Sequence, residues 1–283
     1  MKKNLIIGGF TNYEINQLKP WVLSASQIKD NNTDIVLLSG KTSQKTIDWL
    51  NEQGVITVPM KNITNLPIHV LRFLHIYDYL KEKYEEYEFV VTTDVKDVYF
   101  QTNPFQYIET NNDKKLIVAS EGLRYRDEFW GDENLMQSYG PYVYDEFKNN
   151  EIYNVGTFGG KSEYVKDMVF NIFTNAINRP IPICDQAVFN VLINTQPFRD
   201  VIKYSNDWAC ELGTMMDPSK IESFRPNLLF NEPIWKDGQL FVPCTETKLF
   251  SIVHQYDRVP ELKKFVQKKY EQEDETQFFI YKT

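Results

Sequence analysis

The sequence predicts an α/β fold in which a mostly parallel central sheet is flanked by helices. Through the first half of the chain, short apolar runs alternate with segments of helical periodicity. Strands separated by helices need crossover connections, which make the strands parallel. Because no repeat or Gly/Ser-rich linker interrupts the 283 residues, we expect one domain over 1–283. Within it we distinguish a regular first half (1–110), a less regular second half (111–260) and a C-terminal helix and tail (261–283).

The expected elements follow from their apolar patterns. In the first half, strands are predicted at Asn4–Gly8, Thr33–Leu38, Val55–Pro59 and Glu88–Thr93, with helices at Tyr13–Ile28, Thr42–Gln53 and Pro67–Tyr84. In the second half, strands are predicted at Leu116–Ser120, Ile152–Gly156 and Phe250–Val253, with a helix at Asp185–Ile193. A Tyr- and acid-rich loop of about 30 residues is expected between the strands at 116–120 and 152–156.

Composition excludes some partners and compartments. The formal net charge of −8 disfavours nucleic acid as a partner, because binding to its backbone depends on massed Lys and Arg. Cys184, Cys210 and Cys244 form neither a disulfide framework nor a zinc-ligand spacing, which favours a reducing, cytoplasmic location. No apolar run reaches the length of a membrane helix, so any membrane contact would have to be peripheral.

Acidic residues follow the strand predicted at 88–93. Asp94 and Asp97 lie at its carboxyl end, where ligands of parallel sheets bind. Two neighbouring carboxylates at the end of a buried strand repel each other unless a cation or hydrogen-bond donors compensate, and a divalent metal ion is the simplest compensation. The alternative is local: Asp97 caps the next turn and Asp94 accepts hydrogen bonds from loop amides.

Five segments in the expected order resemble glycosyltransferases of the GT-A type. The segment "YEFVVTTDVKDVYFQTNPF" resembles their aspartate motif, and "NYEINQLKPWVLSAS" resembles their first helix. Three further segments, "IYNVGTFGG", "CDQAVFN" and "FSIVHQYDR", resemble the donor-sugar segment, the Asp-Gln helix start and the late strand that carries a metal-binding histidine. The segments are similar to those of families of the glycogenin and galactosyltransferase type and of uncharacterised bacterial and viral relatives.

The resemblance implies a metal site of Mn²⁺ or Mg²⁺. Asp94, Asp97 and His254 are the expected ligands, and a histidine among carboxylates suits Mn²⁺ better than Ca²⁺. The usual Asp-x-Asp pattern is altered here, because Thr92 stands where the first Asp would fall. Asp97 is therefore expected either as a second direct ligand or as outer support. The alternative for His254 is a hydrogen-bonded structural residue at the end of an apolar strand.

The same resemblance implies contacts to a nucleotide-sugar. Asp185 and Gln186 are expected beside the reacting sugar as catalytic or positioning groups. The remaining expected contacts to the nucleotide, diphosphate and sugar are Gly8, Phe10, Thr11, Arg72, Thr93, Lys96, Asn154 and Gly156. Arg72 and Lys96 could instead face solvent, and Asn154 with Gly156 could form an ordinary turn followed by Gly159 and Gly160.

The implied function is glycosyl transfer, of a hexose by expectation, from a UDP- or GDP-sugar to the hydroxyl of a glycan or other acceptor. A metal-binding histidine on a late strand is similar to what retaining families show, so the resemblance favours retention of anomeric configuration. Inversion would need a carboxylate base, for which four residues of the long predicted loop are candidates: Glu121, Asp127, Glu128 and Asp132.

Three rival functions remain open to different degrees. A nucleotidyltransferase that makes sugar nucleotides would need a basic Gly-rich loop after the first strand, and "GGFTNYE" lacks Arg and Lys. A dehydrogenase would need Gly-x-Gly-x-x-Gly at the same place, which Gly8 and Gly9 do not supply. A non-catalytic protein that binds a nucleotide-sugar or glycan on the same scaffold is the rival from another class.

Overall fold

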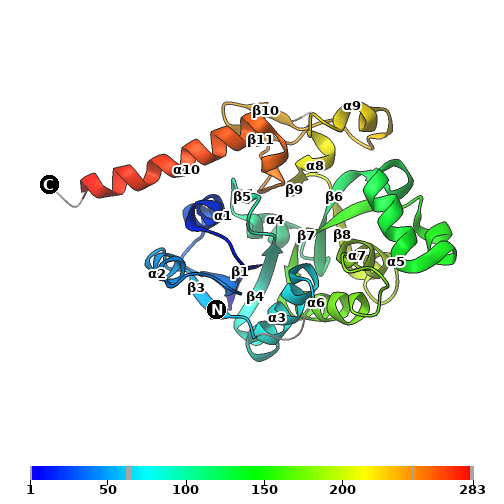
Figure 1. Ribbon diagram of the computed structural model, residues 1–283, viewed down its shortest axis with the longest axis horizontal. Coiled ribbons are helices and arrows are strands. Elements are labelled where there is room, and N and C mark those ends of the chain that lie inside the picture. Colours follow the sequence, from blue (N-terminus) through cyan, green and yellow to red (C-terminus); the bar gives the residue numbers. More distant parts are fainter. Residues whose placement is uncertain (1, 62–65, 244, 246, 281–283) are drawn as a thin grey trace.

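The protein is an α/β structure built on a seven-stranded sheet (Figure 1). The computed structural model describes residues 2–61, 66–243, 245 and 247–280, with side chains described as far as Tyr270. The strand order is β3-β2-β1-β4-β7-β6-β8, and every neighbouring pair is parallel except the two pairs that β7 makes with β4 and β6. The prediction of a mostly parallel sheet flanked by helices is therefore confirmed.

The first half agrees with the predicted elements to within about two residues at each end. Its elements are β1 (Lys3–Phe10), α1 (Ile15–Ile28), β2 (Thr33–Ser39), α2 (Gln44–Glu52), β3 (Ile56–Pro59), α3 (Ile68–Lys83), β4 (Tyr87–Thr93), β5 (Val98–Phe100) and α4 (Pro104–Thr110). Short strand β5 and helix α4 were not predicted from the sequence.

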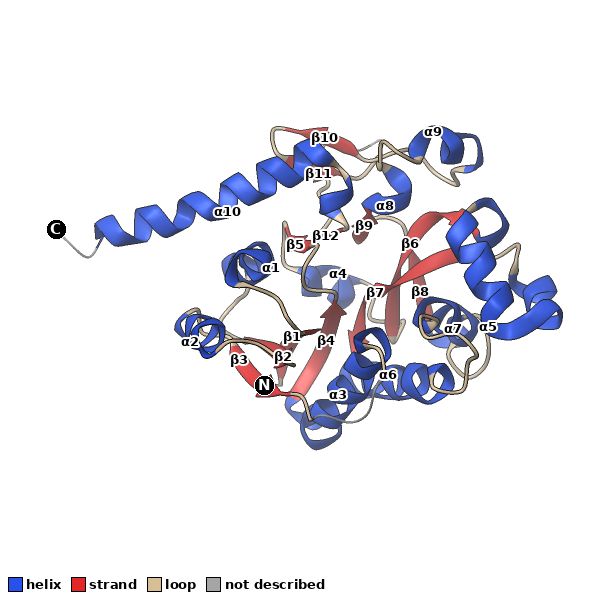
Figure 2. Cartoon of the chain, viewed as in Figure 1, coloured by secondary structure: helices blue, strands red, loops and turns tan. Residues whose placement is uncertain are grey.

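The second half contains β6 (Leu116–Arg124), α5 (Phe129–Phe147), β7 (Glu151–Lys161), α6 (Ser162–Ala176), α7 (Asp185–Ile193), β8 (Ile202–Ser205), β9 (Ala209–Glu211), α8 (Leu212–Met215), α9 (Ile221–Phe224), β10 (Ile234–Lys236), β11 (Gln239–Phe241), β12 (Ile252–His254) and α10 (Pro260–Ile280). Helix α10 extends away from the body of the molecule (Figure 2). The expected tail at 281–283 lies outside the described residues.

Two predictions for the second half are wrong. The expected long loop between β6 and β7 is mostly helix α5, whose two parts meet at Gly140, where φ is 75°. The alternative prediction, an ordinary turn at Asn154 and Gly156, is wrong because β7 runs through both residues and Gly159 and Gly160 continue it, pairing with β4 and β6. A Cβ atom at Gly159 would lie 2.8 Å from the carbonyl oxygen of Val90, so glycine permits close approach of the neighbouring strand here.

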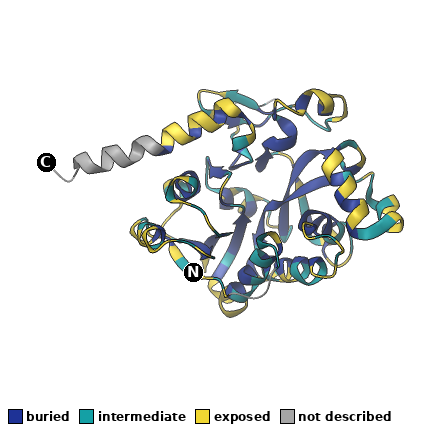
Figure 3. Cartoon of the chain, in the orientation of Figure 1, coloured by how far each residue is buried: buried dark blue, intermediate teal, exposed yellow. Residues whose placement is uncertain are grey.

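Apolar side chains cover both faces of the sheet. Along β1, Leu5 and Ile7 belong to one core cluster, while Ile6 belongs to the other, as the two-residue repeat of a strand requires. Helices α3 and α6 pack on the first face, and α1 packs on the second. The strands are accordingly among the most buried parts of the chain (Figure 3). Burial on both faces fixes the sheet, and with it the positions of the loops at its carboxyl edge.

A second, three-stranded sheet lies beside this edge, in the order β5-β12-β9. Its own apolar cluster includes Val253 and Cys210 from β12 and β9, and Leu262 and Val266 from the first turns of α10. Cys184 and Cys210 are buried free thiols, and Cys244 lies outside the described residues. Among the described residues, none of the helices combines the length and apolarity that a membrane crossing would require.

Candidate active site

Strand register brings the predicted metal ligands together. In the small sheet, His254 of β12 lies opposite Val98 of β5 and opposite Glu211 of β9. Asp97 immediately precedes β5, and Asp94 follows β4, whose end is tied to β7 by the hydrogen bond from Asp94 N to Gly156 O (2.7 Å). The small sheet therefore places the imidazole of His254 beside the loop between β4 and β5 that carries both carboxylates.

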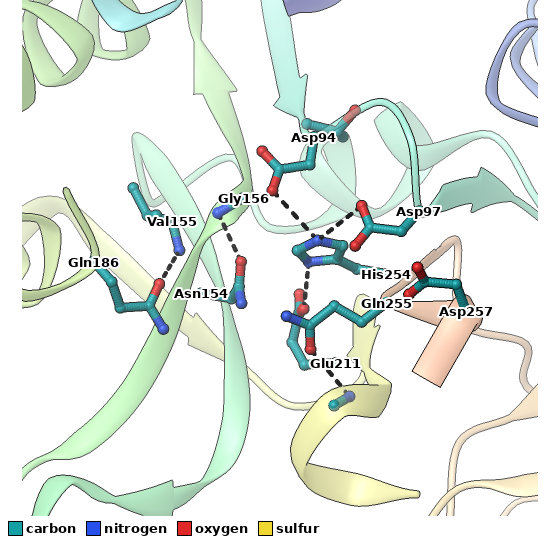
Figure 4. Close-up of polar contacts among 12 residues, drawn as sticks. Asp94, Asp97, Asn154, Val155, Gly156, Gln186, Glu211, His254, Gln255 and Asp257 are labelled. Carbon is teal, nitrogen blue, oxygen red and sulfur yellow. Dashed lines mark hydrogen bonds and ion pairs between the residues drawn. The ribbon is translucent and has the colours of Figure 1, made fainter. Parts of the chain in front are cut away.

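The imidazole of His254 lies among three carboxylates (Figure 4). Its Nε2 atom is 3.5 Å from Asp94 Oδ2 and 3.6 Å from Asp97 Oδ1, and its Nδ1 atom is 2.6 Å from Glu211 Oε2. A carboxylate on Nδ1 places the proton there, so that Nε2 can present a lone pair to a metal ion; this arrangement is common around metal-binding histidines. Glu211 thereby orients the ring toward the two aspartates.

These residues fit a divalent metal ion. Oxygen and nitrogen atoms of Asp94, Asp97 and His254 lie within 4.8 Å of one another, the only such group among the residues that the structure describes. The Nε2 atom of His254 is buried and has no hydrogen-bond partner. Gly156 keeps the space open, since a Cβ atom there would lie 2.6 Å from His254 Cε1 and 2.8 Å from Asp94 Oδ2. Two carboxylates and an imidazole suit Mn²⁺ or Mg²⁺, with the imidazole favouring Mn²⁺.

The charges around His254 are strongly coupled. Burial would lower the pKa of His254, but Glu211 and Asp97 outweigh that effect and raise it to about 10. Burial raises the pKa of Glu211, and His254 opposes the rise. For Asp97, the effect of burial is reversed by His254, and its pKa is lowered. Without a metal ion, a proton on the imidazole therefore neutralises part of this cluster.

We call Asp94, Asp97 and His254 the metal group. Arg72 of α3 connects this group to the start of α7. Its guanidinium forms ion pairs with Asp94 and with Asp185 Oδ2, the latter at 3.3 Å. The Arg72 side chain is only 12% exposed, and burial lowers its pKa, with Asp185 opposing. A buried guanidinium beside a metal group can bind phosphate oxygens, because its planar donors match such anions. The sequence-based alternative, a solvated helix face, is therefore wrong for Arg72.

The next part of the site is a floor of side-chain amides, which we call the amide floor: Asn154, Gln186 and the carboxylate of Glu121 that joins them. Asn154 Nδ2 and Gln186 Nε2 both donate to Glu121 Oε1, at 2.7 and 2.5 Å. Backbone N–H groups of Gly156 and Val155 donate to the carbonyl oxygens of the same two amides, at 2.6 and 2.9 Å (Figure 4). The amide floor is thus fixed in orientation.

Asp94 and His254 of the metal group line one cavity of about 380 Å³ together with the amide floor, whereas Asp97 does not line it. The cavity is also lined by Arg72, Asp185 and Trp130, by Lys220 directly before α9, and by Arg258 just before α10. Polar groups of both signs thus converge in a concave site of the size that small ligands occupy. His69, in the first turn of α3, lines the cavity as well.

Five predicted contacts do not line this cavity: Gly8, Phe10, Thr11, Thr93 and Lys96. Phe10 is 1% exposed and belongs to the core, and Thr93 Oγ1 accepts a buried hydrogen bond from Trp21 Nε1 at 2.8 Å. A Cβ atom at Gly8 would meet Val95, and Thr11 Oγ1 accepts from the backbone N–H of Lys41. These residues support the end of β1 and the loop that carries Asp94.

Two carboxylates of the site gave no clear signal in the sequence. Glu211 ends a three-residue strand, and its partner His254 is far along the chain. Glu121 was considered only as a base for an inverting reaction, together with Asp127, Glu128 and Asp132. Of these four, Glu121 and Glu128 line the cavity, whereas Asp132 accepts from the Tyr144 hydroxyl. A charged residue directly after a buried apolar strand is the signal that could have identified Glu211.

Comparisons with known proteins show the fold but no family. No protein-family model and no curated protein matches the sequence. Among solved structures, the chain is similar to the apo structure of the WbbM bifunctional glycosyltransferase, with a TM-score of 0.56 and 13% sequence identity. The alignment covers 89% of this chain and 45% of that chain, so the protein spans less than half the length of WbbM. The chain therefore shares the fold of part of a glycosyltransferase structure.

Proposed function

We propose that the protein is a metal-dependent glycosyltransferase that moves a sugar, by expectation a hexose, from a nucleotide diphosphate sugar to an acceptor hydroxyl. The observation that carries this proposal is the group of Asp94, Asp97 and His254 at the carboxyl edge of the sheet. Asp94 and His254 of this group line one cavity with Arg72 and Asp185. The glycosyltransferase fold of WbbM supports it. UDP- and GDP-sugars are the donors to test, and a glycan is the expected acceptor.

The residues have distinct roles in this proposal. Asp94, Asp97 and His254 would hold Mn²⁺ or Mg²⁺, which when bound neutralises charge on the diphosphate leaving group. Arg72 binds the same diphosphate and keeps Asp94 and Asp185 in place through its two ion pairs. Asp185 and Gln186 face the sugar, where fixed polar groups stabilise charge that develops as the glycosidic bond breaks. Enclosure in the cavity strengthens these interactions by limiting water.

We further propose retention of the anomeric configuration. The resemblance of the late strand with His254 to retaining families supports this proposal. Glu128, one candidate base for inversion, accepts the N–H of Gly131 at 2.5 Å as the N-cap of α5. Glu121, which gives only Oε1 to the two amides, is the carboxylate that an inverting reaction would use as its base. The configuration of the product, measured by NMR, decides between the two stereochemical courses.

Nucleotide release tests the proposal. UDP- and GDP-sugars are incubated with the protein and Mn²⁺, and released nucleotide is measured together with the thermal shift. We expect Mn²⁺-dependent release and stabilisation, because a ligand that binds only the folded state raises its apparent stability. Asp94→Asn should lower release by at least about a hundredfold, since even outer partners of metal ligands contribute about 10–100-fold.

The exposed Asp113, at the turn after α4, provides the matched control. Asp113→Asn removes the same charge away from the cavity and should leave release unchanged. Stabilisation by nucleotide-sugars without any release would identify a non-catalytic binding protein. Equal release by wild type and Asp94→Asn would refute the site.

A further inference from the structure

Glu121 has a second carboxylate oxygen that the amide floor does not use. Its Oε1 atom accepts both amide hydrogen bonds, and its backbone oxygen accepts the Thr214 hydroxyl at 2.6 Å. Among the described residues, none donates a hydrogen bond to Oε2. Glu121 is 7% exposed and lines the cavity. The geometry leaves one acceptor atom of a fixed, buried carboxylate for a ligand.

The surroundings of Glu121 carry excess negative charge. Burial raises its pKa to about 7, and Glu211 and Glu128 raise it as well, while the amides of Gln186 and Asn154 oppose the rise. The nearby cation Arg72 is already paired with Asp94 and Asp185. Lys220 and Arg258, which also line the cavity, are exposed. Above pH 7, a ligand group that approaches Glu121 therefore meets an acceptor atom in a negative field.

Such a place favours a hydroxyl and disfavours a second anion. A sugar hydroxyl can donate a hydrogen bond to Oε2. It can also accept a hydrogen bond from the second side-chain N–H of Asn154 or Gln186, which Glu121 does not use. A carboxylate on the sugar can donate nothing, and an ionised Glu121 repels it. Two like charges about 6 Å apart at an effective dielectric constant of about 20 repel each other strongly, but protonation of Glu121 limits the effect near its pKa of about 7, so the discrimination grows as pH rises above 7.

We propose that Glu121 determines donor specificity: its free carboxylate oxygen accepts a hydroxyl of a neutral sugar, and its charge excludes donors whose sugar carries a carboxylate. This inference rests on the proposed function. It assigns the donor to the class of neutral nucleotide-hexoses and makes Glu121 a residue that contacts the substrate while also positioning Asn154 and Gln186.

Matched pairs of donors test this inference: UDP-glucose with UDP-glucuronate, UDP-galactose with UDP-galacturonate, and GDP-mannose with GDP-mannuronate. The kcat/KM for Mn²⁺-dependent nucleotide release is measured for each at pH 8.5, above the pKa of Glu121, where its carboxylate is ionised. In wild type, we expect the neutral member of the accepted pair to exceed the acidic member by about thirtyfold at this pH. In Glu121→Gln, which keeps an oxygen for the two amides but removes the charge, this ratio should fall at least tenfold.

Two controls separate specificity from folding. The exposed Glu109→Gln variant, on α4, should keep the wild-type ratio, and thermal melts of each variant report folding. If Glu121 only held the amide floor in place, Glu121→Gln would lower release from both members of a pair and leave the ratio unchanged, which would overturn the inference. Equal use of neutral and acidic donors by wild type would do the same while leaving the proposed function intact. Absence of release from every donor would overturn both.

Discussion

The two sides of the site are built in different ways. On one side, Asp94 and Asp97 come from a single loop that follows the regular strand β4. On the other side, Glu211 and His254 come from β9 and β12, which meet through sheet register, and Glu121 comes from β6 of the large sheet. The first side depends on local sequence, whereas the second depends on how distant segments pair. This difference explains what the sequence could predict, and it can be tested by perturbing each side.

The largest effect is expected at Gly156, where the two sides touch. A Cβ atom there would lie 2.8 Å or less from His254 Cε1, Asp94 Oδ2 and Asn154 Oδ1. Gly156→Ala should therefore displace the metal group and the amide floor together, lowering Mn²⁺-dependent nucleotide release more than about a hundredfold, with an overpacking cost of about 1–3 kcal/mol in stability. Release assays and chemical denaturation measure the two quantities.

Gly159 on the same strand is the matched control. A Cβ atom there would meet the Val90 carbonyl oxygen at 2.8 Å, away from the metal group. Gly159→Ala should destabilise the fold by a similar amount but leave the Mn²⁺ concentration that gives half-maximal release unchanged. If both variants shift that concentration equally, the effect of Gly156→Ala comes from overpacking of β7 in general and not from displacement of the metal group.

The elements that the sequence predicted well are those with a strong local signal. Strands β1, β2 and β4 carry apolar runs that pack on both faces of the sheet, and α7 matches its predicted bounds. Helix α5 was missed because Gly140 and Pro141 interrupt its pattern, and its tyrosines and acids resemble a loop. In β7, Gly159 and Gly160 suggested a turn, although close strand packing is what requires at least the first of them.

The candidate site divides in the same way. Asp94, Asp97 and His254 could be predicted because each follows an apolar strand and the segments resemble a known family. Their spatial association required the fold, because the register between β12, β5 and β9 has no signature in one sequence. Phe10 could not be assigned correctly from the sequence alone, because an aromatic residue at a strand end serves a core as readily as a ligand; here it is buried.

A moderate effect of pH on metal binding is expected through His254, on the side of the site that depends on strand register. The pKa of His254 is raised from 6.5 to about 10, so in the folded, metal-free protein the proton is retained across neutral pH. The stability that this proton confers is fully present below about pH 6.5 and is lost as pH rises toward 10. Because a metal ion must displace the proton, affinity for Mn²⁺ should rise about tenfold per pH unit below the pKa.

Calorimetric titration of the protein with Mn²⁺ at pH 6, 7 and 8 measures this slope, and the heat in buffers of different ionisation enthalpy counts the protons released. His254→Gln cannot hold the proton, so its weaker Mn²⁺ binding should depend less steeply on pH. An affinity that is constant over this range would show that the imidazole is already neutral without metal.

The smallest effect is expected on the local side, at Lys96 between the two aspartates. The sequence suggested a contact to phosphate, but Lys96 is exposed and does not line the cavity, and its backbone oxygen, not its side chain, accepts the Tyr256 hydroxyl at 3.3 Å. A solvated ammonium is screened by salt, so Lys96→Ala should change kcat/KM for nucleotide release less than about twofold. A loss above tenfold that diminishes with added salt would mean that Lys96 turns to the diphosphate when the donor binds, and closeness in sequence to the metal ligands would then be a better guide to the site than the cavity of the ligand-free protein.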